Sequence, residues 1–458
     1  MVSFRKMITF ATIMETEQLY LYFLKCTGVT TDTRSCAPGT MFFALKGERF
    51  DGNAYARQAL DSGCSYAVID DPKVAVPHDE RMLLVDNTLL ALQQLARHHR
   101  RTLGTPVIGI TGTNGKTTTK ELLAAVLTRH FNTLYTQGNL NNSIGVPLTI
   151  LRLTREHQLA VVEMGASHPG DICELVEVAE PDFGIITNVG RAHLQGFGSF
   201  EGVIRTKGEL YDWLRSREDA RIFLHADNPY LTNIAQKLTS TSYSSKDEEA
   251  DIFGKVISCS PFLAFTWQEK DSNESYSVTT HLVGRYNIDN VLCAVAVGRY
   301  FGIDADTINA ALEDYQPTNS RSQLIQTEHN TLIVDAYNAN PTSMRAAIDN
   351  FRCMEASNKR VILGDMKELG NASDSEHLAI VELLSDCGFE AVWFVGDNFK
   401  QALETFLTSP AANGWTAGRT FASADEVIAM LSSEPICSAT LLVKGSNSMR
   451  LSSLVPYL

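Results

Sequence analysis

The chain has 458 residues, of which 44% are hydrophobic and 9% aromatic, so it can form several domains with cores of their own and is not expected to be disordered. Its net charge of −14 excludes a general attraction to nucleic acid or anionic lipid. Nine scattered cysteines without a C-x-x-C pair exclude a disulfide framework, and no apolar run reaches the roughly 18 residues of a membrane span. We expect a cytoplasmic metabolite enzyme with no nucleic-acid or membrane partner.

The first hundred residues mix short strands with helices. Apolar runs at 41–47 (MFFALKG) and 66–70 (YAVID) predict strands, and the basic segment 89–101 (LLALQQLARHHRR) predicts a helix. Gly104 and Pro106 interrupt the helical pattern and predict a linker. We place the first domain at residues 1–102.

In the second region, residues 103–316, apolar strand patterns alternate with helical ones. Strands are expected in VIGIT (107–111), LAVVEMG (159–165), FGIITNVG (183–190) and RIFLHAD (221–227). Such alternation is typical of a parallel sheet covered on both faces. Residues 251–284 are expected to form a short β-rich insertion.

The alternation restarts after a polar stretch, QPTNSRSQ, at 316–323. Further strands are expected in TLIVDAYN (331–338), RVILGDM (360–366), AVWFVGD (391–397) and ATLLVKGS (439–446), with helices between them. The prediction is therefore an α/β protein of three domains: a small α/β domain, a central P-loop domain with a parallel sheet, and a Rossmann-like domain at 317–458. Hinges are expected near 103–106 and 316–320.

The stretch TGTNGKTT (111–118) carries the strongest chemical signal. It fails the strict P-loop pattern, because Ile110 occupies the position of the first glycine, but the physical parts are present. Glycines let backbone N–H groups close round phosphate oxygens, Lys116 supplies a positive charge, and Thr117 offers a hydroxyl to Mg²⁺ at a helix N-terminus. The alternative is a glycine turn that joins a buried strand to a helix. The predicted nucleotide-binding residues are Gly112, Thr113, Asn114, Gly115, Lys116, Thr117 and Thr118.

Several motifs together resemble those of the Mur ligase family. They are TGTNGKTT, GNLNNSIGVP (138–147), VVEMGASHPGDI (161–172), ITNVGRAHL (186–194), TKGEL (206–210), DAYNANPTSM (335–344), LGDMKELG (363–370) and LLVKGS (441–446). The segment TTDTRSCAPGTMFFALKG (30–47) is similar to the family's UDP-binding region. The resemblance begins at Met14, which is a candidate start in place of Met1.

The resemblance implies ATP-dependent amide synthesis. The terminal carboxylate of UDP-N-acetylmuramoyl-tripeptide would attack the γ-phosphate to give an acyl phosphate, and the amine of D-alanyl-D-alanine would then displace phosphate, in peptidoglycan precursor synthesis. Similar enzymes are commonly monomers. Two alternatives stay open: a related ligase, such as folylpolyglutamate synthase, and a non-catalytic P-loop switch. The UDP-like segment argues against the folate ligase, and DAYNANP argues against the switch. The sequence carries no signature that separates meso-diaminopimelate from L-lysine in the tripeptide.

The resemblance also implies a metal-dependent centre. Lys116 would neutralise the β,γ-phosphates, Thr117 and Glu163 would hold one Mg²⁺, and His193 would contact a second. Lys207 would be carbamylated by CO₂, because an unmodified ammonium beside two Mg²⁺ ions would be repelled. The alternatives are that Glu163 is an exposed charge at a strand end, that His193 is a hydrogen-bonded loop histidine, and that Lys207 is a surface lysine paired with Glu201 or Glu209.

Further nucleotide contacts are implied on both sides of the second hinge. Asn287 and Asn290 resemble the family's adenine-binding asparagines, with Tyr286 where a histidine is common; helix capping by Asn287 is the alternative. Arg321 resembles the arginine that reaches the γ-phosphate, and Asp335 resembles the acid that binds the ribose. Domain closure would then complete the site.

Substrate-binding candidates occur in all three domains. They are Asp32, Thr33, Arg34, Lys46 and Gly47 for uracil and diphosphate; Asn139, Asn141 and Asn142 for the middle of the muropeptide; and Asn338, Asn340, Lys444 and Ser446 for the acceptor dipeptide. Turn formation explains the asparagines at 139–142 almost as well. After Ser446 the chain departs from the family pattern, with Asn447 where arginine is usual.

Overall fold

The computed structural model describes residues 14–76, 78–318, 321–412 and 414–458. The choice between Met1 and Met14 as the start therefore lies outside the described residues, as does part of the hinge expected at 316–320. The chain divides into two compact units. The first comprises Met1–Gly109, Phe131–Gly165 and Asp171–Phe183, and the second comprises Ile110–His130, Ala166–Gly170 and Gly184–Leu458. None of the described helices combines the length and apolar character that a membrane crossing requires.

A four-stranded parallel sheet organises the N-terminal part of the first unit. Its strands follow the order β1-β2-β5-β6. Their bounds are β1 Gly28–Thr30, β2 Thr40–Phe43, β5 Tyr66–Ile69 and β6 Met82–Leu84. Phe42, Ala67 and Ile69 pack with Ala59 of helix α2 (Ala56–Asp61) into a core. The remaining elements are α1 (Thr16–Phe23) and the hairpin of β3 (Lys46–Gly47) and β4 (Phe50–Asp51). The expected strands are confirmed.

Helix α3 (Thr88–Leu103) forms where the basic helix was predicted, at residues 89–101. The side chain of Asn87 caps it by accepting a hydrogen bond from the N–H of Leu90 at 2.8 Å, and Gly104 ends it with a left-handed φ of +69°. Its buried face contacts α1, α5 (Gly145–Ile150) and α6 (Asp171–Ala179). Strands β8 (Thr133–Tyr135) and β9 (Leu159–Glu163) of the same unit pair in parallel.

Strand β7 (Val107–Thr111) carries the chain from the first unit into the second, and all five of its residues are buried. In the second unit the strands follow the order β10-β11-β12-β13-β14-β15. Their bounds are β10 Phe183–Ile186, β11 Arg221–His225, β12 Thr239–Ser244, β13 Ile252–Cys259, β14 Phe262–Glu269 and β15 Tyr276–Val283. The pairs β11–β12 and β12–β13 are parallel, and the last two pairs are antiparallel. The β-rich segment at 251–284 therefore extends the sheet as three further strands.

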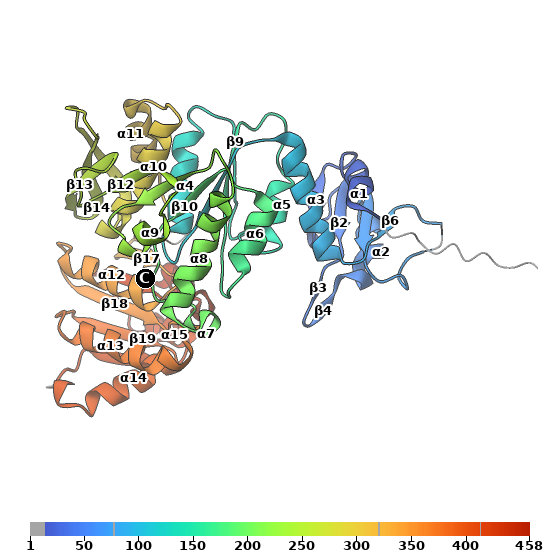
Figure 1. Ribbon diagram of the computed structural model, residues 1–458. Coiled ribbons are helices and arrows are strands. Elements are labelled where there is room, and N and C mark those ends of the chain that lie inside the picture. The colour runs from blue at the N-terminus through green and yellow to red at the C-terminus, as the bar shows by residue number, and fades with distance from the viewer. Residues whose placement is uncertain (1–13, 77, 319–320, 413) are drawn as a thin grey trace, which may run out of the picture. The chain divides into compact units, whose positions relative to one another are not determined.

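Helices accompany these strands (Figure 1). They are α4 (Lys116–Leu127), α7 (Leu194–Phe197), α8 (Phe200–Arg215), α9 (Pro229–Ile234), α10 (Ile288–Tyr300) and α11 (Ala305–Asp314). Helix α10 is buried along most of its length and contacts α4, β11, β12 and β13. It therefore connects the start of the P-loop helix to the side of the sheet.

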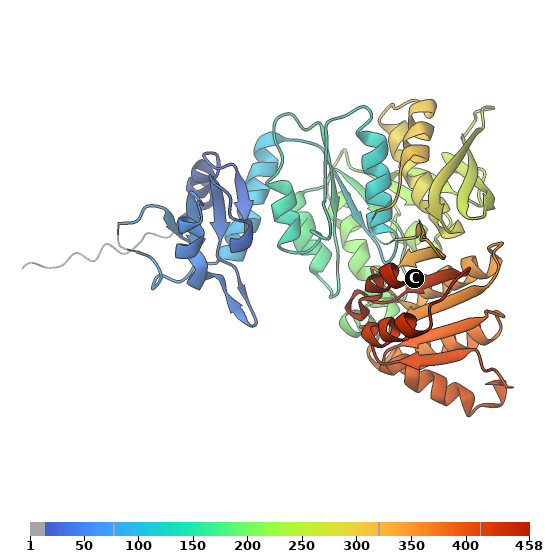
Figure 2. The same ribbon diagram turned by 180° about the vertical axis from the view of Figure 1, so that it is seen from behind.

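The C-terminal part of the second unit is a six-stranded sheet in the order β16-β17-β21-β18-β19-β20. The bounds are β16 Gln323–Gln326, β17 Thr331–Asp335, β18 Lys359–Gly364, β19 Ala391–Val395, β20 Gly418–Phe421 and β21 Thr440–Lys444. Only β16 pairs antiparallel within this sheet. The helices are α12 (Pro341–Cys353), α13 (Ser373–Ser385), α14 (Asp397–Leu407) and α15 (Ala424–Ser433). The final segment η7 (Leu451–Tyr457) packs on α15 and β21 and appears in dark red in Figure 2. The predicted Rossmann-like domain is confirmed.

Candidate active site

Two glycines of the loop between β7 and α4 combine a positive φ with close contacts to neighbouring side chains. Gly112 has a φ of +143°, and a Cβ placed there would overlap the hydroxyl of Thr187. Gly115 has a φ of +79°, and a Cβ there would lie 2.6 Å from Oδ1 of Asn290. Both positions favour glycine for conformation and for space. The loop can therefore present its backbone at the start of α4.

Hydrogen bonds from the end of β10 fix this loop. Thr187 donates its hydroxyl to the carbonyl of Asn114 at 2.6 Å, and Asn188 both donates to that carbonyl and accepts the Asn114 N–H, each at 3.0 Å. The ammonium of Lys116 donates to the carbonyl oxygens of Gly112 at 2.6 Å and Thr113 at 3.2 Å. The lysine charge thus lies over the loop, where a phosphate group would meet it.

A buried chain of amides runs from β15 to the P-loop helix. Asn287 donates to the carbonyl of Val283 at 2.9 Å and accepts from Asn290 at 2.8 Å, and Asn290 in turn accepts from the hydroxyl of Thr119 at 3.0 Å. Asn287 stands at the N-cap of α10 but its side chain makes no capping bond, so the capping alternative is wrong. The adenine contact stays a prediction.

Tyr286, at the position where a histidine is common, shares a hydrogen bond with the hydroxyl of Ser322 at 2.8 Å. Burial raises the pKa of Tyr286, with the charge of Asp335 adding to that rise. The phenol therefore stays neutral and acts as a hydrogen-bonding group between β15 and the strand that begins the C-terminal domain.

His193 precedes α7 in a left-handed conformation with a φ of +50°. Its Nδ1 contacts the carboxylate of Glu368 without hydrogen-bond geometry. Burial lowers the pKa of His193, and the charges of Lys116 and Lys207 add to that effect against the opposing carboxylate of Glu368. The positive charges of both lysines therefore favour the neutral form of the His193 imidazole. A neutral imidazole can bind a metal ion. Glu368 lies in the LGDMKELG motif but was not predicted as a site residue.

Lys207 lies on α8 and is only 2% exposed, so the surface-lysine alternative is wrong. Its ammonium lies 5.5 Å from the centroid of the Phe197 ring. Glu209, one of the suggested partners, accepts a hydrogen bond from the N–H of Gly170 at 2.9 Å. Lys207 therefore faces the protein interior and lies close to α7, which contains Phe197.

Glu163, in the first unit, ends β9 as a 1% exposed carboxylate, so the alternative of an exposed strand-end charge is wrong. Its Oε1 accepts a hydrogen bond from the amide of Asn141 at 2.9 Å. The side chain of Asn142 accepts a hydrogen bond from the N–H of Gly145 at 2.8 Å, as expected if this asparagine forms a turn. The carbonyl of Asn139 accepts a hydrogen bond from the N–H of Asn141 at 2.8 Å. Asn141 thus orients the predicted magnesium ligand.

Two residues of the C-terminal domain that were predicted to bind ligands form an ion pair with each other. The ammonium of Lys444 lies 2.5 Å from Oδ2 of Asp335 and donates to the carbonyl of Asn338 at 3.2 Å. The two residues are register partners on the parallel strands β17 and β21. The family resemblance assigned Asp335 to the ATP ribose and Lys444 to the acceptor dipeptide, and 109 positions separate the two residues along the chain. Ser446 accepts a hydrogen bond from the N–H of Lys367 at 3.0 Å.

Arg321 and Asn340 lie at different points of the same domain. The guanidinium of Arg321 lies 3.9 Å from the ring centroid of Tyr337, and its Nε has no hydrogen-bond partner among the described residues. Asn340 caps α12 by accepting the N–H of Ser343 at 2.9 Å, while its amide donates to Oδ1 of Asn114 at 2.7 Å. The P-loop is thus hydrogen-bonded to the C-terminal domain.

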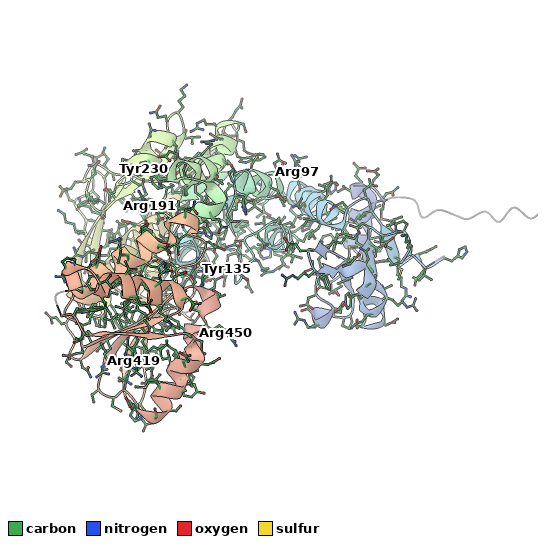
Figure 3. All side chains as sticks on the ribbon, turned by 90° about the horizontal axis from the view of Figure 1, so that it is seen from below. Arg97, Tyr135, Arg191, Tyr230, Arg419 and Arg450 are labelled. Carbon is green, nitrogen blue, oxygen red and sulfur yellow. The ribbon has the colours of Figure 1, made fainter. Side chains whose placement is uncertain are left out.

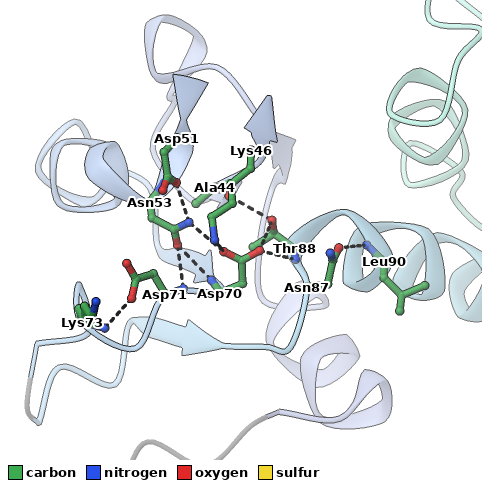
Figure 4. A network of polar contacts seen from close by, with 10 residues as sticks. All are labelled: Ala44, Lys46, Asp51, Asn53, Asp70, Asp71, Lys73, Asn87, Thr88 and Leu90. Atoms are coloured by element: carbon green, nitrogen blue, oxygen red, sulfur yellow. Dashed lines mark hydrogen bonds and ion pairs between the residues drawn. The ribbon is translucent and has the colours of Figure 1, made fainter. Parts of the chain in front are cut away.

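A polar network in the N-terminal domain includes Lys46 (Figure 4). Its ammonium lies 2.8 Å from Asp70, which also accepts from the Asn53 amide at 2.8 Å and from the hydroxyl of Thr88 at 3.2 Å. Gly47 follows Lys46 on β3. Sequence reasoning missed Asp70, although the position at the end of the YAVID strand could have suggested it.

Asp32 and Arg34 form a local pair beside Thr33. The carboxylate accepts the Arg34 N–H at 2.9 Å and lies 2.6 Å from its guanidinium. The Arg34 hydrogen bonds lower the pKa of Asp32 to about 2. Both side chains are exposed, so they are accessible to a ligand.

The three domains match three family models. These are the Mur ligase family catalytic domain at 25–100, the Mur ligase middle domain at 110–298, and the Mur ligase glutamate ligase domain at 320–447. A three-domain α/β ligase is therefore the class defined by the fold and the site.

Similar proteins agree with this class. The UDP-N-acetylmuramoyl-tripeptide–D-alanyl-D-alanine ligase of Escherichia coli is 36% identical over 436 residues, covering 93% of this chain and 92% of that protein. A crystal structure of MurF from Acinetobacter baumannii has a TM-score of 0.84 at 30% identity and covers 98% of this chain and 99% of its own. The MurF ligase of Thermotoga maritima, solved in complex with ADP, has a TM-score of 0.80 at 25% identity and covers 95% and 97%. The chain belongs to the Mur ligase family, and the prediction of an ATP-dependent ligase is confirmed.

Proposed function

We propose that the chain joins D-alanyl-D-alanine to UDP-N-acetylmuramoyl-tripeptide, with ATP converted to ADP and phosphate, in the synthesis of peptidoglycan precursors. The relatives carry this activity in their names and are matched over nearly their whole length. The observation that carries the proposal is the P-loop held by Thr187 and Asn188 at the start of α4, inside a chain that has all three family domains. Because its substrates are cytosolic nucleotides, we assign the enzyme to the cytoplasm.

The first step is phosphoryl transfer to the tripeptide carboxylate, which is mainly a problem of positioning and charge neutralisation. Lys116 meets the phosphates at the N-terminus of α4, where the helix dipole also favours negative charge. The guanidinium of Arg321 lies 3.9 Å from the ring centroid of Tyr337, and we assign this residue to the γ-phosphate. The dipeptide amine then attacks the acyl phosphate, forms the C–N bond, loses a proton and expels phosphate.

The buried polar groups of the chain fit Mg²⁺. Thr117 is a buried hydroxyl at the first turn of α4, Glu163 is a buried carboxylate oriented by Asn141, and His193 is held neutral by its surroundings. We assign Thr117 and Glu163 to one ion and His193 to a second. The ions would supply positive charge to the phosphate oxygens.

Lys207 is proposed to carry a carbamate. The ammonium would first lose a proton, and the neutral amine would then attack CO₂, forming an N–C bond and releasing a second proton, so that a cation becomes an anion. This change would remove the repulsion between a buried ammonium and the metal ions. Burial of Lys207 would protect the modification from bulk water, and the resulting oxygens would orient the ligands of the second ion.

The carbamate can be tested with Lys207→Ala. We expect loss of most ligase activity and partial recovery with added short carboxylic acids, because the acid replaces the missing anion. Carbon-13 NMR of the wild type in ¹³C-bicarbonate should show a carbamate signal that the variant lacks. Normal activity of the variant in bicarbonate-depleted buffer would contradict the proposal.

The ligase activity itself is tested by phosphate release with ATP, UDP-N-acetylmuramoyl-tripeptide and D-alanyl-D-alanine, each substrate omitted in turn. Release should require both, and mass spectrometry should show the UDP-linked pentapeptide. Release independent of both would exclude the ligase. Tripeptides ending in meso-diaminopimelate and in L-lysine, compared side by side, identify the native donor.

Closure of the domains on binding is part of the proposal, because Arg321 and Asp335 belong to the C-terminal domain while the P-loop belongs to the central one. Small-angle scattering should show a monomer whose radius of gyration falls when a non-hydrolysable ATP analogue, Mg²⁺ and tripeptide are added. An unchanged radius would count against closure, and normal turnover of Arg321→Ala would remove the role of that residue.

A further inference from the structure

A histidine and two aspartates meet in a pocket of about 180 Å³ at the carboxyl end of β11. His225 is the last residue of β11, Asp227 follows it, and Asp289 lies in the first turn of α10. One ligand-type atom from each lies within 4.8 Å of the other two. Tyr230, labelled in Figure 3, and the exposed Lys246 also line the pocket. No residue of this cluster has a role in the proposed ligase reaction.

The imidazole of His225 is aimed at the two carboxylates. The residue is 7% exposed, and its ring stacks on Tyr243 at a centroid distance of 5.4 Å with 5° between the planes. Nδ1 lies 3.3 Å from the carbonyl oxygen of Thr187, to which it can donate a proton. Nε2 is buried without a hydrogen-bond partner among the described residues. A backbone carbonyl that holds one ring nitrogen is the usual way to fix a metal-binding histidine, because it leaves the lone pair on the other nitrogen.

Hydrogen bonds hold one of the two carboxylates in place. Asp227 accepts hydrogen bonds from the hydroxyls of Ser244 and Ser245 and, at 2.8 Å, from the N–H of Ser245. Neither Asp227 nor Asp289 has an ion pair with lysine or arginine in the part of the chain that the structure describes. Two carboxylates facing one imidazole carry net negative charge whether or not the imidazole is protonated. The pocket therefore favours a cation.

The distances fit a small divalent cation. Nε2 of His225 lies 3.4 Å from Oδ1 of Asp289 and 3.9 Å from Oδ2 of Asp227. Around a tetrahedral ion with bonds of about 2.0–2.2 Å, neighbouring ligand atoms are about 3.3–3.5 Å apart. Of the two pairs that include the histidine, one already has this separation and the other needs to shorten by roughly half an ångström, and the two carboxylate oxygens lie within 4.8 Å of each other. One nitrogen and two oxygens suit Zn²⁺ or Mn²⁺ better than Mg²⁺, which prefers oxygen alone.

We propose that His225, Asp227 and Asp289 bind a structural divalent cation, Zn²⁺ or Mn²⁺, with water completing its coordination. The ion would join the end of β11 to the first turn of α10. In that turn, Asp289 lies between Asn287 and Asn290 in the sequence. It would also fix the ring that contacts the carbonyl of Thr187, whose hydroxyl holds the P-loop. This site shares no residue with the proposed magnesium centre.

The test is calorimetric titration of the full-length, nucleotide-free protein with Zn²⁺ alone and with Mn²⁺ alone, in excess Mg²⁺ to saturate the catalytic residues. Wild type should bind one ion per chain and melt at a higher temperature when loaded. His225→Asn and Asp289→Asn should each weaken binding more than about tenfold, since even the outer partners of a metal ligand have that effect. Glu163→Gln, in the proposed magnesium centre, and Asp306→Asn, an exposed carboxylate on α11, should bind as wild type does.

Either of two titration results would overturn the proposal. Unchanged binding in His225→Asn would place the ion elsewhere, and no binding by the wild type would mean that the cluster is a buried ion pair only. If circular dichroism shows that both variants are unfolded, X-ray absorption of the zinc-loaded wild type decides. A shell with one nitrogen supports the site, and a shell of oxygen alone overturns it. Because none of these readouts depends on turnover, failure of the proposed ligase function would be seen separately.

Discussion

Two lysines of the predicted site, Lys116 and Lys46, are held in different ways. Lys116 begins a helix, and its ammonium rests on backbone carbonyl oxygens of a glycine loop. Lys46 lies on a short exposed hairpin and reaches a carboxylate, Asp70, from another strand. The first arrangement depends on backbone shape and the second on pairing of side chains. A local sequence motif therefore defines the P-loop lysine well but says little about the partner of Lys46.

Lys116→Ala is expected to have the largest effect, and it tests the role of the lysine that the glycine loop holds. We expect kcat to fall by about 10³-fold or more, because removal of one preorganised charge at a transition state has effects of that order. The thermal midpoint should stay close to that of the wild type. Lys255→Ala, which removes an exposed lysine paired with Glu248, should leave turnover unchanged. Near-normal turnover of Lys116→Ala would contradict the role assigned to the loop.

Gly115→Ala tests the role of backbone shape. The new Cβ would lie 2.6 Å from Oδ1 of Asn290 at a φ of +79°, so we expect a loss of about 1–3 kcal/mol in the free energy of unfolding together with weaker nucleotide binding. Gly388→Ala is the matched control, because its φ of +69° is similar and no atom lies within 4 Å of the added Cβ. Equal losses in chemical denaturation would mean that conformation alone, without the Asn290 contact, explains the glycine.

Asp70→Asn tests the side-chain pairing through its pH dependence. Burial raises the pKa of Asp70, but the ammonium of Lys46, the amide of Asn53 and the N–H of Thr88 together lower it below its ordinary value. A lowered folded-state pKa gives stability that is full above about pH 4 and is lost as the pH falls through the folded-state value. We expect the variant to lose about 1–2 kcal/mol at neutral pH. The difference from wild type should shrink in acid, and a constant difference would contradict this account.

Lys46→Ala should have the smallest effect on stability. The lysine side chain is 48% exposed, so solvent screens the pair and we expect only a small change in the free energy of unfolding. If Lys46 also contacts the diphosphate, KM for the UDP-linked substrate should rise while kcat stays near wild type. A lower kcat with unchanged KM would mean that Lys46 acts on the reacting groups instead.

The sequence predicted much of the fold because local patterns are informative where strands are apolar and buried. Strands β7, β9, β17 and β21 were expected at nearly their observed positions. The short strands β16 (QLIQ) and β20 (GRTF) were not expected, because too few apolar residues distinguish them from loops. They form because neighbouring strands supply the hydrogen bonds.

For the site, motifs indicated residues but not their partners. The pairs Asp335–Lys444 and His193–Glu368 join segments that are far apart in the chain, and no periodicity connects them. The asparagines of the predicted adenine contact form a buried chain whose order depends on how α10 packs against α4. His225 gave no signal in the sequence, since a single histidine at the end of a strand has many explanations.

Asn340 has two hydrogen-bonding duties at once, with α12 through Ser343 and with the P-loop through Asn114. The stability of the first turn of α12 is therefore linked to the state of the nucleotide loop, and the linkage is reciprocal. In hydrogen–deuterium exchange, the amides of that turn should report occupancy of the P-loop, although they belong to another domain. One asparagine thus makes local helix fraying a measure of nucleotide binding.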